Sequence, residues 1–155
     1  RDLGKHRLTA KLGIQPTDKQ FTLARIKQLL AHRKTIVKNF LLDQKNIAGI
    51  GNVYIQDTLF RARLHPNRKI HTLTPQEITA LYHAIKDTLN HAIKLGGLAY
   101  EKDFYGKHGK LTIDKFQVGY KTGKPCPQCS TTIQKIRTGT TASYICPKCQ
   151  PLTPT

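Results

Sequence analysis

Four cysteines, arranged as two close pairs near the C-terminal end, constrain the fold more than any other feature of this 155-residue chain. Cys126 and Cys129 form one Cys-x-x-Cys pair, Cys146 and Cys149 form the second, and sixteen residues separate the two pairs. This spacing predicts a zinc ribbon, in which each pair supplies two thiolates to one tetrahedral Zn²⁺. Such a zinc ion would be structural, because four thiolates leave no coordination position for water or a substrate.

Two other states of the cysteines stay open at this point: a pair of disulfides, or four unrelated thiols. A two-disulfide framework suits a secreted domain, but no signal peptide is recognisable and the rest of the chain has no cysteine to cross-link. Residues 131–137 and 141–145 predict two short strands, so that a hairpin carries the second cysteine pair. The pattern favours zinc and a reducing compartment, the cytoplasm.

The charge balance favours a nucleic-acid partner. The chain carries 26 Lys and Arg against nine Asp and Glu, a formal net charge of +17. Solvated basic surface and contact with acidic membranes are the alternatives, but a membrane anchor needs a hydrophobic or lipid signal that is missing here. No apolar run is long enough to cross a bilayer, and we expect no membrane partner. The length allows one modest core plus a metal-held appendage.

The first half of the chain predicts helices on either side of a glycine-rich turn. After a loose N-terminal segment over residues 1–20, Thr22 is the expected cap of a helix to about residue 32, and a second helix covers 35–44 with Lys38 open to solvent or a partner. Gly49 and Gly51 then permit a tight turn, and Asn52 is the expected cap of a helix over 53–62. A helix N-terminus cleared by glycines suits a phosphate, although a plain turn explains the pattern equally well.

A capping box at Thr74-Pro75-Gln76-Glu77 predicts the longest helix, which Gly96-Gly97 ends. Its apolar stripe is expected in the core of a helical domain over residues 21–97: Ile78, Leu81, Tyr82, Ile85, Leu89 and Ile93. Residues 98–111 form a loop that is either a functional flap or a linker, 112–150 form the zinc finger, and 151–155 form a tail. Between residues 116 and 150 there are five Lys or Arg and no acid, which favours contact with phosphates.

Several motifs together resemble the C-terminal half of the formamidopyrimidine-DNA glycosylase and endonuclease VIII family, and the formamidopyrimidine branch is the more similar. The motifs are Lys38, Leu41-Leu42-Asp43-Gln44, Ala48-Gly49-Ile50-Gly51-Asn52-Val53-Tyr54, Leu59-Phe60, His65-Pro66, Gly96-Gly97, Phe116-Gln117-Val118, Gly123-Lys124-Pro125-Cys126 and Cys146-Pro147-Lys148-Cys149-Gln150. The resemblance implies a mainly α fold with a small β part: a helix-two-turns-helix DNA-binding domain followed by a four-cysteine zinc finger.

The resemblance also implies a function. The chain would be the DNA-binding half of a bifunctional glycosylase and AP lyase that excises oxidised purines, of the formamidopyrimidine and 8-oxoguanine type, in base excision repair. Asn52 and the amide of Gly51 would hold a DNA phosphate beside the lesion, Lys38 would lie near the damaged nucleotide, and the loop after Gly97 would close over the flipped base. The expected partner is double-stranded DNA with a damaged base or abasic site, bound by a monomer in a bacterial nucleoid.

The chain departs from the family pattern at four places. Thr141 stands where the finger normally has a phosphate-binding arginine, and Lys121 and Arg137 are candidate replacements. Val118-Gly119-Tyr120-Lys121 replaces Val-Tyr-Gly-Arg, Gln56-Asp57 replaces the usual Asp-Glu, and Leu98-Ala99 replaces Thr-Thr. These positions affect the phosphate grip of the finger and the recognition of 8-oxoguanine.

No catalytic residue is identified in the chain. The family's nucleophile is an N-terminal proline followed by a glutamate, whereas this sequence begins Arg1-Asp2-Leu3-Gly4. We therefore expect a fragment of a longer enzyme that is inactive alone. The alternative is a non-catalytic nucleic-acid-binding module, associated with DNA or with RNA and the ribosome.

Overall fold

The protein is described here by a computed structural model over residues 12–97 and 105–153. Within these residues four α-helices precede one two-stranded antiparallel hairpin, which confirms the predicted mainly α fold with a small β part. Two short 3-10 turns, Ile70–Thr72 and Ile113–Lys115, lie in the connections. The α-helices and strands are α1 Leu23–Leu30, α2 Val37–Leu42, α3 Asn52–Arg61, α4 Pro75–Lys94, β1 Gln134–Thr138 and β2 Thr141–Ile145.

The two helices with clear start signals begin where the sequence predicts. The Thr22 hydroxyl accepts a hydrogen bond from the Arg25 amide at the start of α1, at 3.1 Å. At the start of α4, the Glu77 amide donates to Thr74 Oγ1 and the Thr74 amide donates to Glu77 Oε2, at 3.1 and 3.0 Å. The predicted capping box is therefore confirmed, with Pro75 as the first helical residue.

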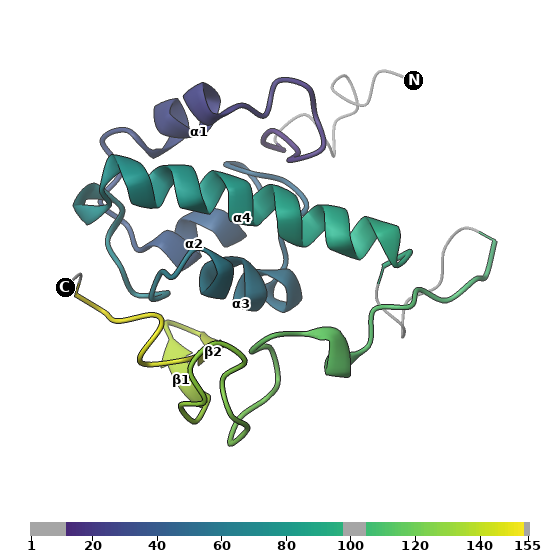
Figure 1. Ribbon diagram of the computed structural model, residues 1–155. Helices are drawn as coiled ribbons and strands as arrows, with labels where there is room; N and C mark the ends of the chain where they lie inside the picture. The colour runs from purple at the N-terminus through teal and green to yellow at the C-terminus, as the bar shows by residue number, and fades with distance from the viewer. Residues whose placement is uncertain (1–11, 98–104, 154–155) are drawn as a thin grey trace.

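The helices pack in layers around α4. Helix α1 lies on one side of α4, and α2 and α3 lie on the other side, between α4 and the zinc-finger hairpin (Figure 1). One apolar core joins the four helices, with Phe21, Ile26, Leu41, Ile55 and Leu81 among its fully buried members. The predicted α4 stripe contributes to this core up to Leu89, but Ile93 is 59% exposed and its assignment to the core was wrong.

The segment between α2 and α3 makes two consecutive turns. Gln44 shapes them with its side-chain amide, which donates to Ile50 O at 2.9 Å and accepts from the Gly49 amide at 2.9 Å. Gly49 has φ +94°, a conformation that favours glycine. Helix α3 begins one residue earlier than predicted: Gly51 is its cap and Asn52 its first residue, without a side-chain capping bond. The predicted capping role of Asn52 was therefore wrong, because its carboxamide faces Gln56 instead.

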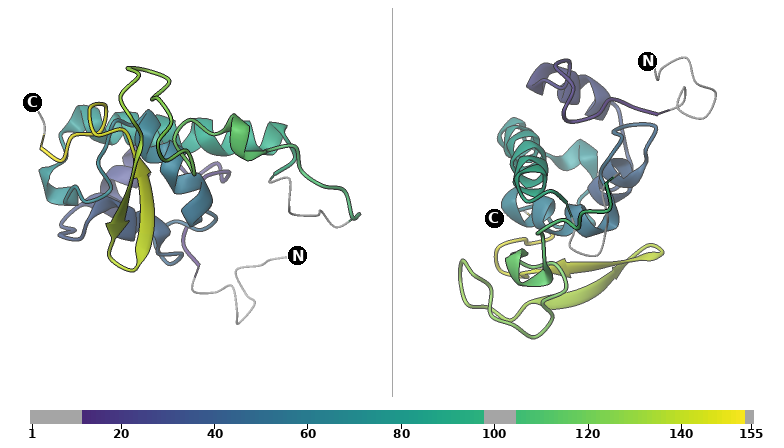
Figure 2. Two further views of the ribbon diagram at one scale, coloured as in Figure 1. Left: turned by 90° about the horizontal axis from the view of Figure 1, so that it is seen from below. Right: turned by 90° about the vertical axis from the view of Figure 1, so that its right-hand side faces the viewer.

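The zinc finger forms its own layer below α2 and α3, as Figure 1 and the right-hand view of Figure 2 show. In the hairpin, Gln134 pairs with Ile145 and Thr138 with Thr141, so that residues 139 and 140 form the connection. Strand β1 begins at Gln134, three residues later than predicted. The finger has a small apolar core, which includes Val118, Ile133 and Tyr144, and Phe60 of α3 completes it. Helix α3 thus belongs to both layers.

Candidate metal centre and nucleic-acid interface

The four cysteines come together in one cluster. Their sulfur atoms all lie within 4.8 Å of one another, with the Cys126 and Cys149 sulfurs 3.9 Å apart and the Cys129 and Cys146 sulfurs 3.4 Å apart. A disulfide needs about 2.05 Å, so these thiols are not paired covalently. In a tetrahedral site with Zn–S bonds of about 2.3 Å, neighbouring sulfurs lie about 3.8 Å apart. The cluster therefore has the dimensions of a four-thiolate zinc site.

Backbone amides near the cysteines further suit a metal centre. The Gln128 amide donates to Cys126 Sγ and the Cys149 amide donates to Cys146 Sγ, each at 3.4 Å, which stabilises thiolates. The thiols of Cys129 and Cys149 differ widely in pKa. Hydrogen bonding with Thr131 lowers the pKa of Cys129 to about 6, whereas burial raises that of Cys149 to about 12. A bound metal cation would favour the thiolate form of the cysteines that coordinate it.

The N-terminus of α3 is a candidate phosphate site. Helices α1 and α4 have their first turns capped by threonine side chains, and the first amides of α2 donate to the carbonyls of Arg68 and Pro66. Helix α3 starts at the exposed Gly51 without a side-chain cap. Apart from its own chain neighbours, a Cβ at Gly51 would meet no described atom within 4 Å. The approach to this helix end is therefore unobstructed on that side, as an anion requires.

Lys38 is buried, whereas the sequence suggested an exposed side chain. Its side chain has 0% exposed surface, so the expectation that it is open to solvent or a partner was wrong. Its ammonium donates to Ala142 O at 2.6 Å and to Ser143 Oγ at 2.8 Å, both in strand β2. Burial lowers the pKa of Lys38 to about 8. Lys38 thus connects α2 to the finger through its buried ammonium.

Gln56 and Asp57 make further connections between α3 and the finger. The Asp57 carboxylate accepts hydrogen bonds from the amides of Gln117, Val118 and Gly119, at 2.8, 3.0 and 3.2 Å. Gln56 Oε1 accepts from the Tyr144 amide at 3.0 Å. The departure from the family pattern at these two residues therefore falls on the contact between the helices and the finger.

Sequence reasoning missed a third connection, made by Gln150. Its Oε1 accepts from the Cys146 amide and its Nε2 donates to Leu64 O, both at 3.0 Å, and its side chain is fully buried. A polar residue directly after the last cysteine was the only signal in the sequence. Nothing local could identify Leu64 as its partner, because 86 residues separate the two.

The other predicted DNA contacts lie on the finger. Arg137 is exposed and donates from Nε to Gly139 O at 3.1 Å, which holds its side chain near the hairpin tip. A groove of ≈ 410 Å³ beside it is lined by Lys135, Ile136, Arg137, Thr140, Thr141 and Ala142. Lys121 lies elsewhere on the finger and donates to Asp114 O at 3.1 Å. The two replacements suggested for the missing arginine thus occupy different parts of the finger.

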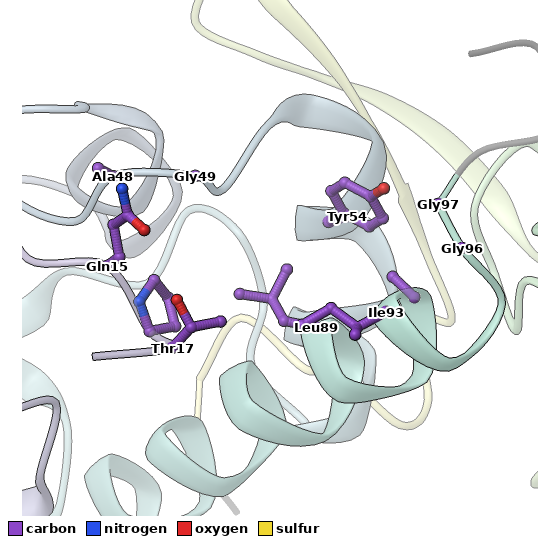
Figure 3. A pocket seen from close by; sticks show the side chains of 11 residues that line it. Gln15, Thr17, Ala48, Gly49, Tyr54, Leu89, Ile93, Gly96 and Gly97 are labelled. Carbon is purple, nitrogen blue, oxygen red and sulfur yellow. The ribbon is translucent and has the colours of Figure 1, made fainter. Parts of the chain in front are cut away.

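A mainly apolar pocket of ≈ 510 Å³ lies beside the two-turn segment (Figure 3). It is bounded by the N-terminal segment at Gln15, the turn at Gly49, Tyr54 of α3 and the C-terminal end of α4. Its wall includes Gly96 and Gly97, after which the loop expected to cover a flipped base begins. Residues 98–104 of that loop lie outside the described residues. In the described part of the chain, no helix has the length and hydropathy that a bilayer crossing requires.

Comparisons with known families agree with this geometry. A family model described as the formamidopyrimidine-DNA glycosylase H2TH domain matches residues 12–103. A second model, described as a zinc finger found in FPG and IleRS, matches residues 123–152. The two matches coincide with the helical layers and with the cysteine cluster.

Individual proteins are similar over nearly the whole chain. The formamidopyrimidine-DNA glycosylase of Pelotomaculum thermopropionicum is 42% identical over 142 residues, which cover 90% of this chain and 51% of that protein. The formamidopyrimidine-DNA glycosylase of Roseiflexus sp. is 39% identical over 149 residues, covering 95% and 54% respectively. The chain therefore spans about half the length of the curated relatives it matches.

Solved structures show the same arrangement. Lactococcus lactis Fpg, in a complex with DNA containing an abasic site, superposes with a TM-score of 0.83 at 34% identity, covering 93% of this chain and 53% of that one. MutM (Fpg) of Thermus thermophilus superposes with a TM-score of 0.86 at 31% identity, covering 99% and 59%. The described fold is thus shared with about half of each of these proteins.

Proposed function

Because the chain belongs to the formamidopyrimidine-DNA glycosylase family, whose H2TH domain model matches more than half of its length, we propose that it is the DNA-gripping part of a bifunctional DNA glycosylase and AP lyase. The reaction would remove oxidised purines of the formamidopyrimidine and 8-oxoguanine type in base excision repair. The relatives named above carry this glycosylase name, and one similar structure is a complex with abasic-site DNA.

One observation carries the proposal: an uncapped helix N-terminus and a basic hairpin are held beside each other by hydrogen bonds. The start of α3 offers Gly51 and Asn52 to a phosphate, and the hairpin groove offers Lys135 and Arg137. Such an arrangement grips a DNA backbone at two points, which base-excision chemistry needs while a nucleotide leaves the stack. The apolar pocket beside Gly49 is the proposed place for the extruded base.

Zinc is the proposed resident metal, held by Cys126, Cys129, Cys146 and Cys149. A bound Zn²⁺ would supply folding energy to the finger and no reaction step, since its four positions are filled by protein sulfur. The proposed partner is duplex DNA with a damaged base or an abasic site, bound by a monomer. The proposed location is the bacterial cytoplasm, at the nucleoid.

The chain by itself is proposed to bind damaged DNA without cutting it. Lyase chemistry needs a free amine to attack the sugar, and an ordinary lysine is protonated at neutral pH. Lys38 has a lowered pKa, but its ammonium is buried and donates to Ala142 and Ser143. Borohydride trapping on abasic-site DNA tests this point: no trapped complex is expected with the chain alone. A complex that forms readily and disappears in Lys38→Ala would make Lys38 the nucleophile.

The alternative is a non-catalytic module that binds RNA or the ribosome. Competition separates the two functions, because a glycosylase half should prefer duplex DNA with an abasic site over both intact DNA and double-stranded RNA of equal length. Equal binding to RNA and DNA of equal charge would favour the alternative, since a non-specific cationic surface responds mainly to phosphate density.

A further inference from the structure

We propose that Gln56 is a positioning residue that joins the α3 N-terminus and the finger hairpin into one preset DNA-binding surface. The inference rests on the proposed function, because it assigns a role within the same DNA interface. Gln56 is a buried residue with 2% of its surface exposed. Its carboxamide reaches Asn52 at the start of α3 and strand β2 of the hairpin at once.

The hydrogen bonds of Gln56 use both ends of its carboxamide. Nε2 donates to Asn52 O at 2.8 Å, with Asn52 Oδ1 at 3.3 Å, and to Ala142 O at 3.3 Å. Oε1 accepts from the Tyr144 amide at 3.0 Å. A primary amide offers two donors and an acceptor, and all of them are used here. Movement of the hairpin relative to Asn52 would therefore break at least one buried hydrogen bond.

Lys38 reinforces the same point of contact. Its ammonium donates to Ala142 O at 2.6 Å, the carbonyl that Gln56 also reaches. Lys38 lies on α2 and Gln56 on α3, so the helices on both sides of the two-turn segment converge on one carbonyl of β2. Ala142 directly follows Thr141, which lines the hairpin groove. The convergence thus fixes β2, whose residue Ala142 pairs with Arg137 of β1, one of the proposed phosphate contacts.

Glutamine supplies both the donors and the acceptor that the partners at this position use. An aspartate, the residue that the resemblance leads one to expect here, could accept from Tyr144 but has no N–H for the carbonyls of Asn52 and Ala142. Its side chain is also shorter by one methylene group.

The test compares two buried glutamines that both connect the finger to the helices. Gln56→Met removes the hydrogen bonds to Asn52 and to strand β2 at nearly constant side-chain volume. Gln150→Met is the matched control, because native Gln150 bonds Cys146 and Leu64 and does not reach Asn52. Both zinc-loaded variants are titrated with a short duplex that contains an abasic-site analogue, at several salt concentrations. Hydrogen exchange of the Tyr144 amide reports the state of the hairpin.

Gln56→Met is expected to bind the duplex about tenfold more weakly, equivalent to about 1.4 kcal/mol, with faster exchange at Tyr144. Its log–log salt slope should fall by about 0.9 for each phosphate that the variant no longer reaches. Gln150→Met should keep the native affinity and slope. If Gln56→Met does not fold with zinc, Gln56→Asn replaces it, because the shorter amide cannot span the same partners.

Native affinity and salt slope in a folded, zinc-loaded Gln56 variant would overturn the inference, and so would equally weakened binding in the Gln56 and Gln150 variants. Failure of the native chain to bind the duplex would instead reject the proposed function. The two failures are therefore distinguishable within one set of titrations.

Discussion

Lys38 is a buried cation whose hydrogen-bond partners, Ala142 O and Ser143 Oγ, are both uncharged. Burying an ammonium without an opposing charge is costly, and hydrogen bonds offset only part of that cost. Burial accordingly lowers the pKa of Lys38 to about 8. The side chain that the sequence suggested to be exposed instead holds α2 to strand β2 of the finger.

The lowered pKa of Lys38 predicts a pH-dependent stability. Between pH 8 and about 10.5 the unfolded chain binds more protons at this residue than the folded chain, so the free energy of unfolding should rise with pH. We expect the native chain to gain stability relative to Lys38→Met across this window, in denaturant titrations with saturating zinc. Lys27→Met, at an exposed site of α1, controls for the lost charge. If the difference in free energy of unfolding between the native chain and Lys38→Met stays constant across this pH window, burial does not lower the pKa of Lys38.

The thiols predict a pH-dependent zinc affinity. Burial raises the pKa of both Cys146 and Cys149, so each should lose a proton when zinc binds. Apparent affinity should therefore rise by more than about tenfold per pH unit near neutrality, where two or more protons are released. Competition with a chromogenic chelator at a series of pH values measures this. An affinity independent of pH would show that the cluster is not a thiolate metal site.

The contact between α3 and the finger joins the helical part of the chain to the cysteine-bearing part. Phe60 fills the core of the finger, and the neighbouring Asp57 accepts three backbone amides from residues 117–119. The chain segment that leads into the first cysteine pair is therefore fixed to a helix. The finger is built partly on α3 and is not an independent appendage.

Asp57→Ala should destabilise the finger by about 2–3 kcal/mol, because it leaves buried amides without an acceptor. Zinc release during denaturant titration measures this loss, and far-UV circular dichroism follows the helices. Asp87→Ala, at an exposed site of α4, is the matched control and should have little effect. An unchanged midpoint of zinc release in Asp57→Ala would mean that the carboxylate does not hold the finger.

Thr141→Arg tests the hairpin as a DNA-binding element. An arginine at the groove beside Arg137 should tighten duplex binding and steepen the log–log salt slope by about 0.9 if it adds one phosphate contact. Thr140→Arg adds the same charge at the neighbouring loop position and separates a specific contact from a general electrostatic gain. Equal effects of the two substitutions would indicate that position 141 does not face a phosphate.

Local signals made much of this fold predictable. The capping box of α4, the cap of α1 and the cysteine spacing each depend on residues close in sequence, and the structure confirms these elements and the clustering of the cysteines. The burial of Lys38 depends on a contact with Ala142, which lies 104 positions further along the chain. The hydrogen bond from Gln150 reaches Leu64, which lies 86 positions earlier. Helical periodicity cannot predict such contacts, because it describes one element at a time.

The α4 stripe illustrates the same limit at its end. Ile93 continues the apolar period, yet it lies 59% exposed beside the pocket near Gly96 and Gly97. Periodicity gives the direction in which a side chain points but not whether another element covers it. In the same way, the glycine pattern predicted the turn before α3 but not that Gly51, rather than Asn52, caps it.

The chain combines a large positive charge with two elements that we propose face DNA, the start of α3 and the hairpin. Its formal net charge is +17. An ion pair between Arg68 and Glu77, with 2.9 Å between nitrogen and oxygen, stabilises the connection that leads into α4. Charge alone gives non-specific attraction to any polyanion. The uncapped end of α3 and the zinc-held hairpin are what would turn this attraction into a defined grip on damaged DNA.

Duplex binding with and without zinc tests whether the start of α3 and the zinc-bound hairpin together bind damaged DNA. The zinc-loaded chain is titrated with abasic-site DNA at several salt concentrations, and the titration is repeated after chelation. We predict a log–log salt slope of about −0.9 per phosphate bound, and a smaller slope with weaker binding once zinc is removed, because the unfolded hairpin no longer holds the DNA backbone. An affinity for DNA that changes neither with salt nor with chelation would show that the zinc-held hairpin does not contact the DNA backbone.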